Sequence, residues 1–520
     1  MKVIVIGLDG ARLDVIKKWV KEGHLPAFEK LIKKGTSGNL RTTLPGPHSV
    51  PAWTSLFTGR NPGKHNVLYW RQLKERDYKL KTISSKDVKT KRIWNYLSEM
   101  DKKCIIVNAL LTYPPEKVNG ILISGWTTPD QDREYTYPRE IKKILEKFNY
   151  RIVPECRNRS KESLDRLYKA LEARINVVYW LMENYEWDIF INIFFETEIL
   201  HHLYSSFLDP LHPQYNPEYE KIVMGCYKKI DSFIQSLIDN IPKTTIFVVS
   251  DHGFSPVRNK IYLNFVLEKH GFLRKKRLFH KSQYKTTDYI KKIMKITLPE
   301  TIKKKLQRKR VEKEMEMVID WEKTRAFCAM GAIGDIYINV VGKYPHGIVS
   351  KEEYNNVRED IIEKLKNDPE IGDKIRGIYR REEIFSGPYF DQTPDISIFF
   401  NGKCYSNLYK GVAAEPVDET VGFHTLDGIF IAYGTDIKEN YTITNAKIVD
   451  VTPTILHIFG IPIPRDMDGR VLKEIFKGDS EFAKREIVYQ EIDEKWRIRE
   501  RIRKLKFEGR FGTHSISQKR

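Results

Sequence analysis

Six side chains that can bind metal stand close to strand-like segments of this sequence. Each lies near the end or the start of a short apolar run, such as VIVIGL, FINIFF, TTIFVV or GIFIAY. One Asp, Glu or His in such a place is usually a cap or a surface residue, but six of them are much less expected by chance. Three carboxylates and three imidazoles suit a pair of zinc-like ions. The candidate ligands are Asp9, Glu198, His202, Asp251, His252 and His424.

Ser49 is a group on which such ions could act. It lies in a loop and is followed by Pro51 and by small residues that could open a helix. A serine is a poor nucleophile near neutral pH unless a base or a metal lowers its pKa. Two metal ions about 4 Å apart can hold an alkoxide on one side and a leaving oxygen on the other. Ser49 could also be a helix N-cap, and the two roles are compatible because a helix start favours an anionic phosphoryl group.

For these side chains to meet, the strands that carry them must end at the same edge of one sheet. The first 260 residues alternate strand-like and helix-like segments, which predicts a mostly parallel sheet covered on both faces. In such sheets, chemistry gathers at the carboxyl ends of the strands. The predicted strands span residues 3–8, 103–108, 188–195 and 245–250, and the predicted helices span residues 12–34 and 163–185.

The composition changes along the chain and predicts four parts. Residues 1–255 form the first part of a core, and residues 256–410 form a cap or insertion that begins with a basic, helix-prone stretch. The core resumes over residues 411–490, where the sequence is again apolar and strand-like. A basic helix and tail close the chain at residues 491–520.

Composition excludes several classes of protein. The chain has 520 residues and is 41% hydrophobic, so it can bury a large core and is neither disordered nor fibrous. No apolar run is long enough to predict a membrane-spanning helix, and the N-terminal run has no cleavage site. The five cysteines are far apart and form no CxxC, which argues against a disulfide framework. We therefore expect a cytoplasmic protein.

The net charge of +20 is concentrated in two segments. From Arg274 to Lys313 there are sixteen Lys or Arg and three acidic residues, and from Lys495 to Arg520 there are ten and two. The rest of the chain is nearly neutral. Each segment could be a solvated helix face, or it could dock an anionic polymer, a lipid surface or a polyanionic substrate.

The motifs together resemble the alkaline phosphatase superfamily, in its type I phosphodiesterase/nucleotide pyrophosphatase branch. That family carries a nucleophilic Thr or Ser with a Pro two residues on, then TG, then P..H, and it has an SDHG motif. The matching residues here are Ser49 and Pro51, Thr58 and Gly59, Pro62 and His65, and Ser250 to Gly253. The resemblance covers nearly the whole chain and implies an α/β three-layer sandwich with a mostly parallel central sheet and an inserted cap.

The resemblance also implies a ligand scheme and a reaction. One divalent ion would bind Asp9, Asp251 and His252, with Ser49 bridging to it, and the other would bind Glu198, His202 and His424. The ions would be Zn, with Mn as the alternative. Ser49 would attack phosphorus in line to give a phosphoseryl intermediate, which activated water would then hydrolyse.

Three positions depart from the family pattern. Glu198 stands where the family has Asp, so its carboxylate reaches one methylene further, and metal occupancy could change. Trp70 stands 21 residues past Ser49, where nucleotide pyrophosphatases carry a phosphate-holding Asn, so nucleotide substrates of that type are in doubt. Asn66 replaces a Gly, which is a tolerable turn variant. The sulfatase modification signal is broken by Trp53.

We therefore expect a metal-dependent hydrolase of phosphate mono- or diesters, acting on a phosphorylated small molecule or a phosphodiester. The first alternative is phosphoryl or phospho-headgroup transfer to an alcohol at the same site. The second is a non-catalytic protein that binds nucleic acid or an anionic membrane through the two basic segments. The sequence does not name the substrate or the oligomeric state.

Overall fold

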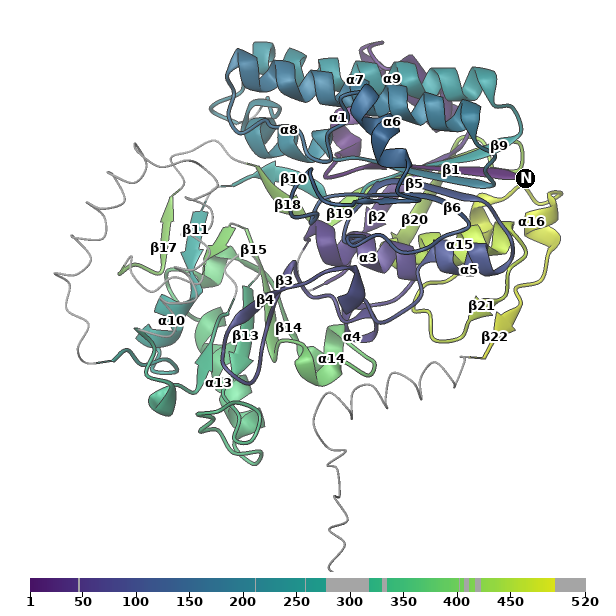
Figure 1. Cartoon of the computed structure of the whole chain (residues 1–520). Helices are drawn as coiled ribbons and strands as arrows, with labels where there is room; N and C mark the ends of the chain where they lie inside the picture. Colours follow the sequence, from purple (N-terminus) through teal and green to yellow (C-terminus); the bar gives the residue numbers. More distant parts are fainter. Residues whose placement is uncertain are drawn as a thin grey trace, which may run out of the picture.

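The chain folds into a large core and a smaller cap beside it (Figure 1). The computed structural model describes residues 1–44, 47–210, 212–257, 259–276, 318–329, 334–401, 403–405, 411–416 and 422–491. The basic segment from Arg274 to Lys313 lies outside the described residues except for its first three. The segment from Lys495 to Arg520 lies outside them entirely. In the described part of the chain, no helix combines the length and apolar character that crossing a bilayer requires.

A nine-stranded mixed sheet forms the centre of the core, in the order β20-β2-β19-β9-β1-β8-β5-β6-β7. The inner strands β9, β1, β8, β5 and β6 are parallel to one another and read as continuous apolar runs, because both of their faces are covered. Strands β19 and β7 run antiparallel to their inner neighbours. The strands are β1 (Lys2–Leu8), β2 (Thr36–Arg41), β5 (Cys104–Ala109), β6 (Gly120–Ser124), β7 (Thr136–Tyr137), β8 (Ile189–Phe194), β9 (Thr244–Val249), β19 (Asp427–Tyr433) and β20 (Tyr441–Lys447).

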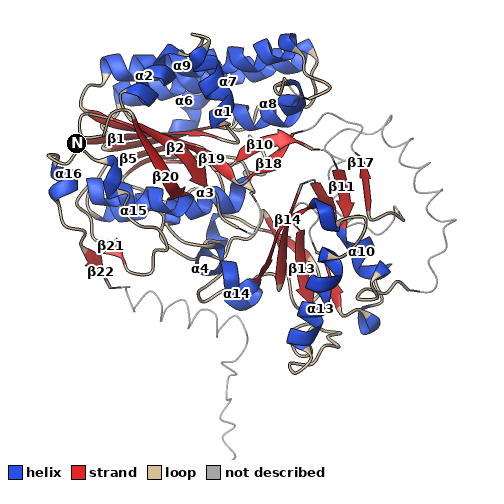
Figure 2. Ribbon diagram, turned by 180° about the vertical axis from the view of Figure 1, so that it is seen from behind, coloured by secondary structure: helices blue, strands red, loops and turns tan. Residues whose placement is uncertain are grey.

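Helices cover both faces of this sheet and complete the three-layer sandwich that the sequence predicts (Figure 2). Alternate residues of β1 enter opposite apolar clusters: Ile4 and Ile6 face one helix layer, and Val3 and Val5 face the other. The first layer comprises α1 (Leu13–Lys21), α2 (Pro26–Lys33), α6 (Ile141–Lys147), α7 (Lys161–Asn184), α8 (Glu196–Tyr204) and α9 (Pro217–Asn240). The second comprises α3 (Ser49–Thr58), α4 (Pro62–His65), α5 (Ile93–Glu99), α15 (Val451–Ile458) and α16 (Glu481–Lys484), with the short pair β21 (Ile463–Pro464) and β22 (Tyr489–Gln490) nearby.

The prediction of one helix over residues 12–34 is wrong in one respect, because this segment forms two helices, α1 and α2. Gly23 adopts a left-handed backbone with φ of +78°, which ends α1, and Pro26 begins α2. Glycine takes this conformation without strain and proline suits the first turn of a helix. The break lets both short helices pack their apolar faces on the sheet.

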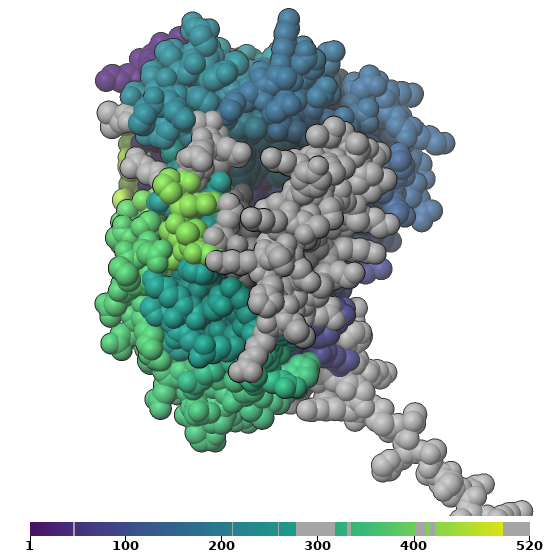
Figure 3. Space-filling view, turned by 90° about the vertical axis from the view of Figure 1, so that its left-hand side faces the viewer, coloured from purple at the N-terminus to yellow at the C-terminus, as the bar shows by residue number. Residues whose placement is uncertain are grey.

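The cap has its own antiparallel sheet and its own apolar core. Four strands lie in the order β12-β13-β15-β14, and three short strands lie in the order β16-β11-β17. The elements are β11 (Asn259–Tyr262), α10 (Leu263–Lys269), β12 (Ala326–Phe327), β13 (Gly334–Ile338), α13 (Tyr354–Lys366), β14 (Ile375–Arg380), α14 (Arg381–Ile384), β15 (Ile396–Phe400), β16 (Lys403–Tyr405) and β17 (Ala414–Pro416). The light-green segment that contains β17 lies between core and cap in the space-filling view (Figure 3).

A hairpin from the core, β3 (Arg71–Leu73) and β4 (Leu80–Thr82), reaches into the cap. The Tyr78 ring stacks on Trp321 with 3.8 Å between ring centroids, and its hydroxyl donates to Asn339 Oδ1 over 2.9 Å. This hairpin follows α3 and α4 closely in the chain. It therefore ties the cap to the segment that carries Ser49.

Candidate active site

The candidate ligands gather at one edge of the central sheet. Asp9 follows β1, Asp251 and His252 follow β9, and α8 begins directly after β8 and carries Glu198 in its first turn. Strands β9, β1 and β8 are neighbours and parallel, so their carboxyl ends lie side by side. Of the two remaining side chains, His202 lies one turn further along α8, and His424 comes from the ribbon of β10 (Gly253–Pro256) and β18 (Gly422–Thr425).

Ser49 lies at the start of α3 with its side chain turned toward these ligands. Its hydroxyl donates to Asp9 Oδ1 over 3.2 Å and lies 3.1 Å from His252 Nε2. The other Asp9 oxygen accepts from the Trp53 indole N–H over 2.9 Å. All four side chains are buried. Asp9 is therefore held in a fixed orientation between the serine and the tryptophan.

The two oxygens of Glu198 face two different groups of ligands. Oε1 lies 2.9 Å from His202 Nε2 and 3.1 Å from His424 Nε2. Oε2 faces the other side, 4.0 Å from His252 Nε2. Potential ligand atoms of Glu198, His202 and His424 lie within 4.8 Å of one another, and so do those of Asp9, Glu198 and His252. Glu198 therefore belongs to both groups, whereas the sequence-based scheme placed it in one.

Backbone carbonyls set the orientation of the three imidazoles. His424 Nδ1 lies 2.9 Å from the Pro47 carbonyl, His202 Nδ1 lies 3.1 Å from that of Gly422, and His252 Nδ1 lies 3.1 Å from that of its neighbour Gly253. A carbonyl only accepts hydrogen bonds, so each Nδ1 carries the proton. The Nε2 lone pairs then point into the cluster, as in a neutral imidazole that ligates a metal.

This arrangement fits divalent cations. The His202 and His424 Nε2 atoms are only 3.3 Å apart, and two lone pairs at that distance need a positive charge between them. Among the described residues, the buried atoms Glu198 Oε2 and Asp251 Oδ2 have no hydrogen-bond partner. Buried carboxylates are ordinarily paired or bound to metal. Histidine nitrogens with carboxylate oxygens are a donor set that zinc accepts.

Electrostatics within the site agrees with this fit. Burial, with the nearby Asp251 and Glu198 carboxylates, raises the pKa of Asp9 well above its usual value. Burial and Glu198 raise the pKa of Asp251 in the same way. Burial acts to raise the pKa of Glu198, but its interactions with the neighbouring His424 and His202 rings outweigh burial and hold that pKa well below its usual value. A bound cation stabilises all three ionised carboxylates together.

The comparison with known families decides what this arrangement is. The family model described as "Type I phosphodiesterase / nucleotide pyrophosphatase" matches residues 3–427. The chain belongs to this family. It is accordingly a phosphodiesterase/phosphatase-type hydrolase of the alkaline phosphatase superfamily, as the motifs predicted. No curated protein sequence matches the chain.

Solved structures share the fold of this family member at low sequence identity. Murine ectonucleotide pyrophosphatase/phosphodiesterase 5 is 14% identical with a TM-score of 0.52, and the match covers 92% of this chain and 100% of that one. An inactive variant of the murine protein in complex with AMP gives a TM-score of 0.51 at 14% identity, with the same coverage. Phosphonoacetate hydrolase from Sinorhizobium meliloti 1021, in complex with phosphonoacetate, is 14% identical with a TM-score of 0.55, over 87% of this chain and 94% of that one.

Two residues that shape the site, Trp53 and Gly10, were not identified from the sequence. Trp53 binds Asp9 from one turn beyond Ser49 on α3, and the spacing of four residues was the available signal. Gly10 has φ of +69° and its N–H donates to Asp251 Oδ1 over 3.1 Å. A Cβ at this position would lie 2.7 Å from Glu198 Oε2, so only glycine fits.

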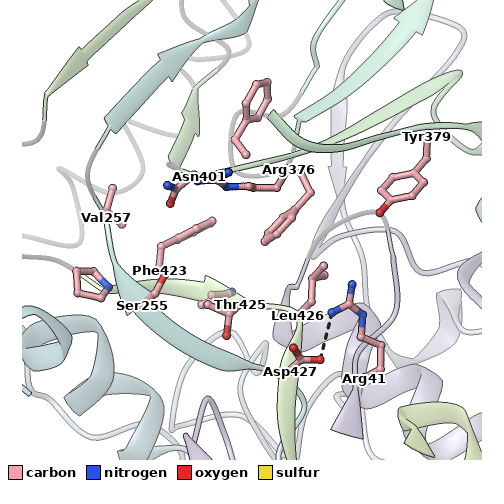
Figure 4. A pocket seen from close by; sticks show the side chains of 14 residues that line it. Arg41, Ser255, Val257, Arg376, Tyr379, Asn401, Phe423, Thr425, Leu426 and Asp427 are labelled. Atoms are coloured by element: carbon pink, nitrogen blue, oxygen red, sulfur yellow. Dashed lines mark hydrogen bonds and ion pairs between the residues drawn. The ribbon is translucent and has the colours of Figure 1, made fainter. Parts of the chain in front are cut away.

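A pocket of about 410 Å³ lies between β18 and the cap in this hydrolase (Figure 4). Phe423 and Thr425 alternate with His424 along β18, and both are half-buried whereas His424 is buried. The cap contributes Arg376 and Tyr379, among others. His424 also lines the pocket, so the pocket and the ligand cluster share the strand β18 as a wall.

Proposed function

We propose that this hydrolase cleaves phosphate esters with Ser49 as the nucleophile and with a pair of divalent ions, Zn or Mn, in the ligand cluster. The observation that carries the proposal is the position of Ser49 Oγ, 3.2 Å from Asp9 Oδ1 and 3.1 Å from His252 Nε2 at the start of a helix. Ser49 is the first residue of α3 and His48 is the N-cap, so the N-cap role considered for Ser49 is wrong and does not explain the two ligand side chains at its hydroxyl.

The residues divide into two metal-binding groups. Asp9 and His252 would hold one ion with Ser49 and with Asp251, whose Oδ2 lies 3.2 Å from His252 Nε2, while His202 and His424 would hold the other with Glu198, whose two oxygens reach both groups. When bound, such ions lower the pKa of a coordinated hydroxyl and offset the negative charge of a phosphoryl group.

The chain's own groups then define the first half of the reaction. Asp9 Oδ1 accepts the Ser49 hydroxyl hydrogen, and Trp53 keeps Asp9 from rotating away. Ser49 Oγ forms a bond to phosphorus as the ester P–O bond on the opposite side breaks, and the proton that Ser49 gives up ends on the leaving oxygen, so that an alcohol leaves. The N-terminal end of α3 points its positive dipole at the phosphoryl group.

Water completes the turnover in the second half of the reaction. Its oxygen bonds to phosphorus, the bond from Ser49 Oγ to phosphorus breaks, and the serine regains its proton while phosphate or a phosphomonoester leaves. A backbone carbonyl fixes each imidazole of the ligand shell, so the rings need not reorient between the two halves.

Trapping the covalent intermediate tests this proposal. Protein loaded with Zn or Mn is mixed with bis-p-nitrophenyl phosphate, quenched with acid within milliseconds, and digested for mass spectrometry. We expect a peptide that carries a p-nitrophenyl phosphate group on Ser49, because only one of the two p-nitrophenyl groups leaves when the bond from Ser49 to phosphorus forms. A burst of p-nitrophenol with no such adduct at any time would contradict it. Adding a competing alcohol to the steady-state reaction separates hydrolysis from phosphoryl transfer, because transfer gives a new ester.

A further inference from the structure

Two histidines beside the nucleophile helix are built alike, but they differ in one hydrogen bond. The Val50 N–H donates to His48 Nδ1 over 3.3 Å, and the Val67 N–H donates to His65 Nδ1 over 3.1 Å. In each case the donor lies two residues further along the chain. The N–H donor requires a lone pair on Nδ1, so a neutral ring carries its proton on Nε2.

The Nε2 atoms of the two rings have different surroundings. His65 Nε2 lies 2.8 Å from Ser55 Oγ, so both of its nitrogens have partners inside the protein. His48 Nε2 has no hydrogen-bond partner among the described residues, although the residue is only 7% exposed. Among the described residues it is not one of the fully buried polar atoms that lack a partner, so this N–H is reachable from solvent and is free to donate to a ligand.

The His48 ring lies on the edge of the ligand cluster. It directly precedes Ser49, and its centroid is 6.1 Å from that of His424 and 4.1 Å from that of Tyr69. Nδ1 is turned toward the start of α3, so Nε2–H points away from the helix backbone. Glu198, His202 and His424 are the titratable groups whose charges act on this ring.

A neighbouring donor is already engaged elsewhere. The Trp70 side chain forms a hydrogen bond with the Tyr69 hydroxyl, so its indole N–H is used within the protein. Tyr69 in turn contacts the His48 ring and helps to fix it. Among the described side chains on this side of Ser49, the Trp70 indole is therefore engaged, whereas the His48 Nε2–H and the Tyr69 O–H have no acceptor within the described residues. Of these two donors, His48 directly precedes the nucleophile.

We propose that His48 donates a hydrogen bond from Nε2 to an oxygen of the phosphoryl group under attack by Ser49. The inference rests on the proposed function and adds a phosphoryl-binding residue to it. A neutral donor of fixed orientation strengthens its bond as charge builds on the phosphoryl oxygens in the transition state. Loss of one such donor typically costs a factor of 10² to 10³ in turnover.

Matched substitutions at the two histidines test the proposal. The variants are His48→Phe and His48→Met, which remove the donor, His48→Gln, which keeps an N–H donor, and His65→Gln as the control. Each metal-loaded protein is titrated with orthovanadate by calorimetry, assayed with bis-p-nitrophenyl phosphate, and melted to obtain Tm. We expect His48→Phe and His48→Met to weaken vanadate binding and to lower kcat/KM, each by about 100-fold.

The conservative variant and the control separate phosphoryl binding from packing. His48→Gln should recover both quantities to within about tenfold of the wild type. His65→Gln should lower Tm and leave the vanadate Kd unchanged. Folded His48→Phe or His48→Met protein with wild-type vanadate affinity would overturn the inference, as would an equal loss in His48→Gln. A trapped p-nitrophenyl phosphate adduct on Ser49 in those variants would show that the proposed function stands even so.

Discussion

Asp251 in the core and Asp335 in the cap are both fully buried, and each has one oxygen without a hydrogen-bond partner among the described residues. Around Asp251, other carboxylates and imidazoles converge, with His252 Nε2 at 3.2 Å. Around Asp335, the partner is a single hydroxyl, Ser397 Oγ at 3.0 Å. Within the described residues, groups that could hold a metal occur only in the core. A buried carboxylate thus indicates a candidate metal site when further ligands converge on it, and among the described residues no such ligands converge on Asp335.

The largest expected effect concerns Glu198, the residue that joins the two ligand groups. Glu198→Gln replaces one charged oxygen by an amide, and we expect kcat/KM to fall by at least about 1,000-fold because the Oε1 and Oε2 contacts cannot both be kept. Metal analysis of the purified variant should show fewer bound ions than the wild type.

Glu198→Asp sharpens the same prediction. It restores the family's residue but shortens the side chain by one methylene, so it should keep the ion near His202 and His424 and weaken the contact toward His252. Wild-type metal content and activity in both variants would show that Glu198 does not bridge the two groups.

The next effect concerns the hairpin that ties the core to the cap. Tyr78→Ala removes a buried ring that stacks on Trp321, which we expect to cost about 3 kcal/mol in the free energy of unfolding. Limited proteolysis should then cut the cap faster, while the metal content of the core stays at the wild-type value. Concerted loss of metal and cap would contradict the separation of the two regions.

The contrast between the two carboxyl groups predicts a pH effect of intermediate size. Burial raises the pKa of Asp335 to about 7, so the folded protein binds its proton more tightly than the unfolded chain. This contribution to stability is complete at low pH and is lost as the pH rises toward 7, by up to about 1.4 kcal/mol per pH unit. In the Asp335→Asn variant, the free energy of unfolding should therefore decline less steeply between pH 5 and 7 than in the wild type.

Chelator treatment separates the pH dependence of stability in the core from that in the cap. Burial and charge also raise the pKa values of Asp9 and Asp251, so metal-free protein should lose stability as the pH rises. Added metal should abolish the pH dependence of stability that comes from Asp9 and Asp251 in the core. It should leave unchanged the pH dependence that comes from Asp335 in the cap. Chemical denaturation at several pH values measures both, and an Asp335 contribution that metal removes would contradict the account.

The smallest expected effect concerns the rim of the pocket between β18 and the cap. Arg41 and Asp427 form an ion pair of 3.1 Å there, and their side chains are 45% and 49% exposed. Exposed pairs contribute about 0.2 to 1 kcal/mol and are screened by salt. Arg41→Ala should therefore change the free energy of unfolding by less than about 1 kcal/mol. A larger change that persists in high salt would show that the pocket holds core and cap together.

Much of the core, and the meeting of the candidate ligands at one edge of its sheet, could be predicted from sequence, because the signal is local. A buried parallel strand reads as an apolar run, and the residue after it lies at the functional edge, as for Asp9 and Asp251. The α8 ligands Glu198 and His202 are one helical turn apart and share a face. These properties need no knowledge of distant contacts.

The remaining features depend on contacts between distant segments. Trp53 reaches Asp9 across 44 residues, and Tyr78 meets Asn339 across 261 residues. The use of both Glu198 oxygens depends on where His252 and His424 are placed by other strands. No local pattern in the sequence encodes these distances, so they emerged only from the folded chain.

Substitution of the nucleophile tests the central claim most directly. Ser49→Ala removes only the hydroxyl that contacts Asp9 and His252, and it leaves the six ligands in place. With Tm and metal content matching those of the wild type, we expect turnover of bis-p-nitrophenyl phosphate to fall by at least about 1,000-fold. Turnover within tenfold of the wild type by the folded, metal-loaded variant would contradict nucleophilic catalysis by Ser49.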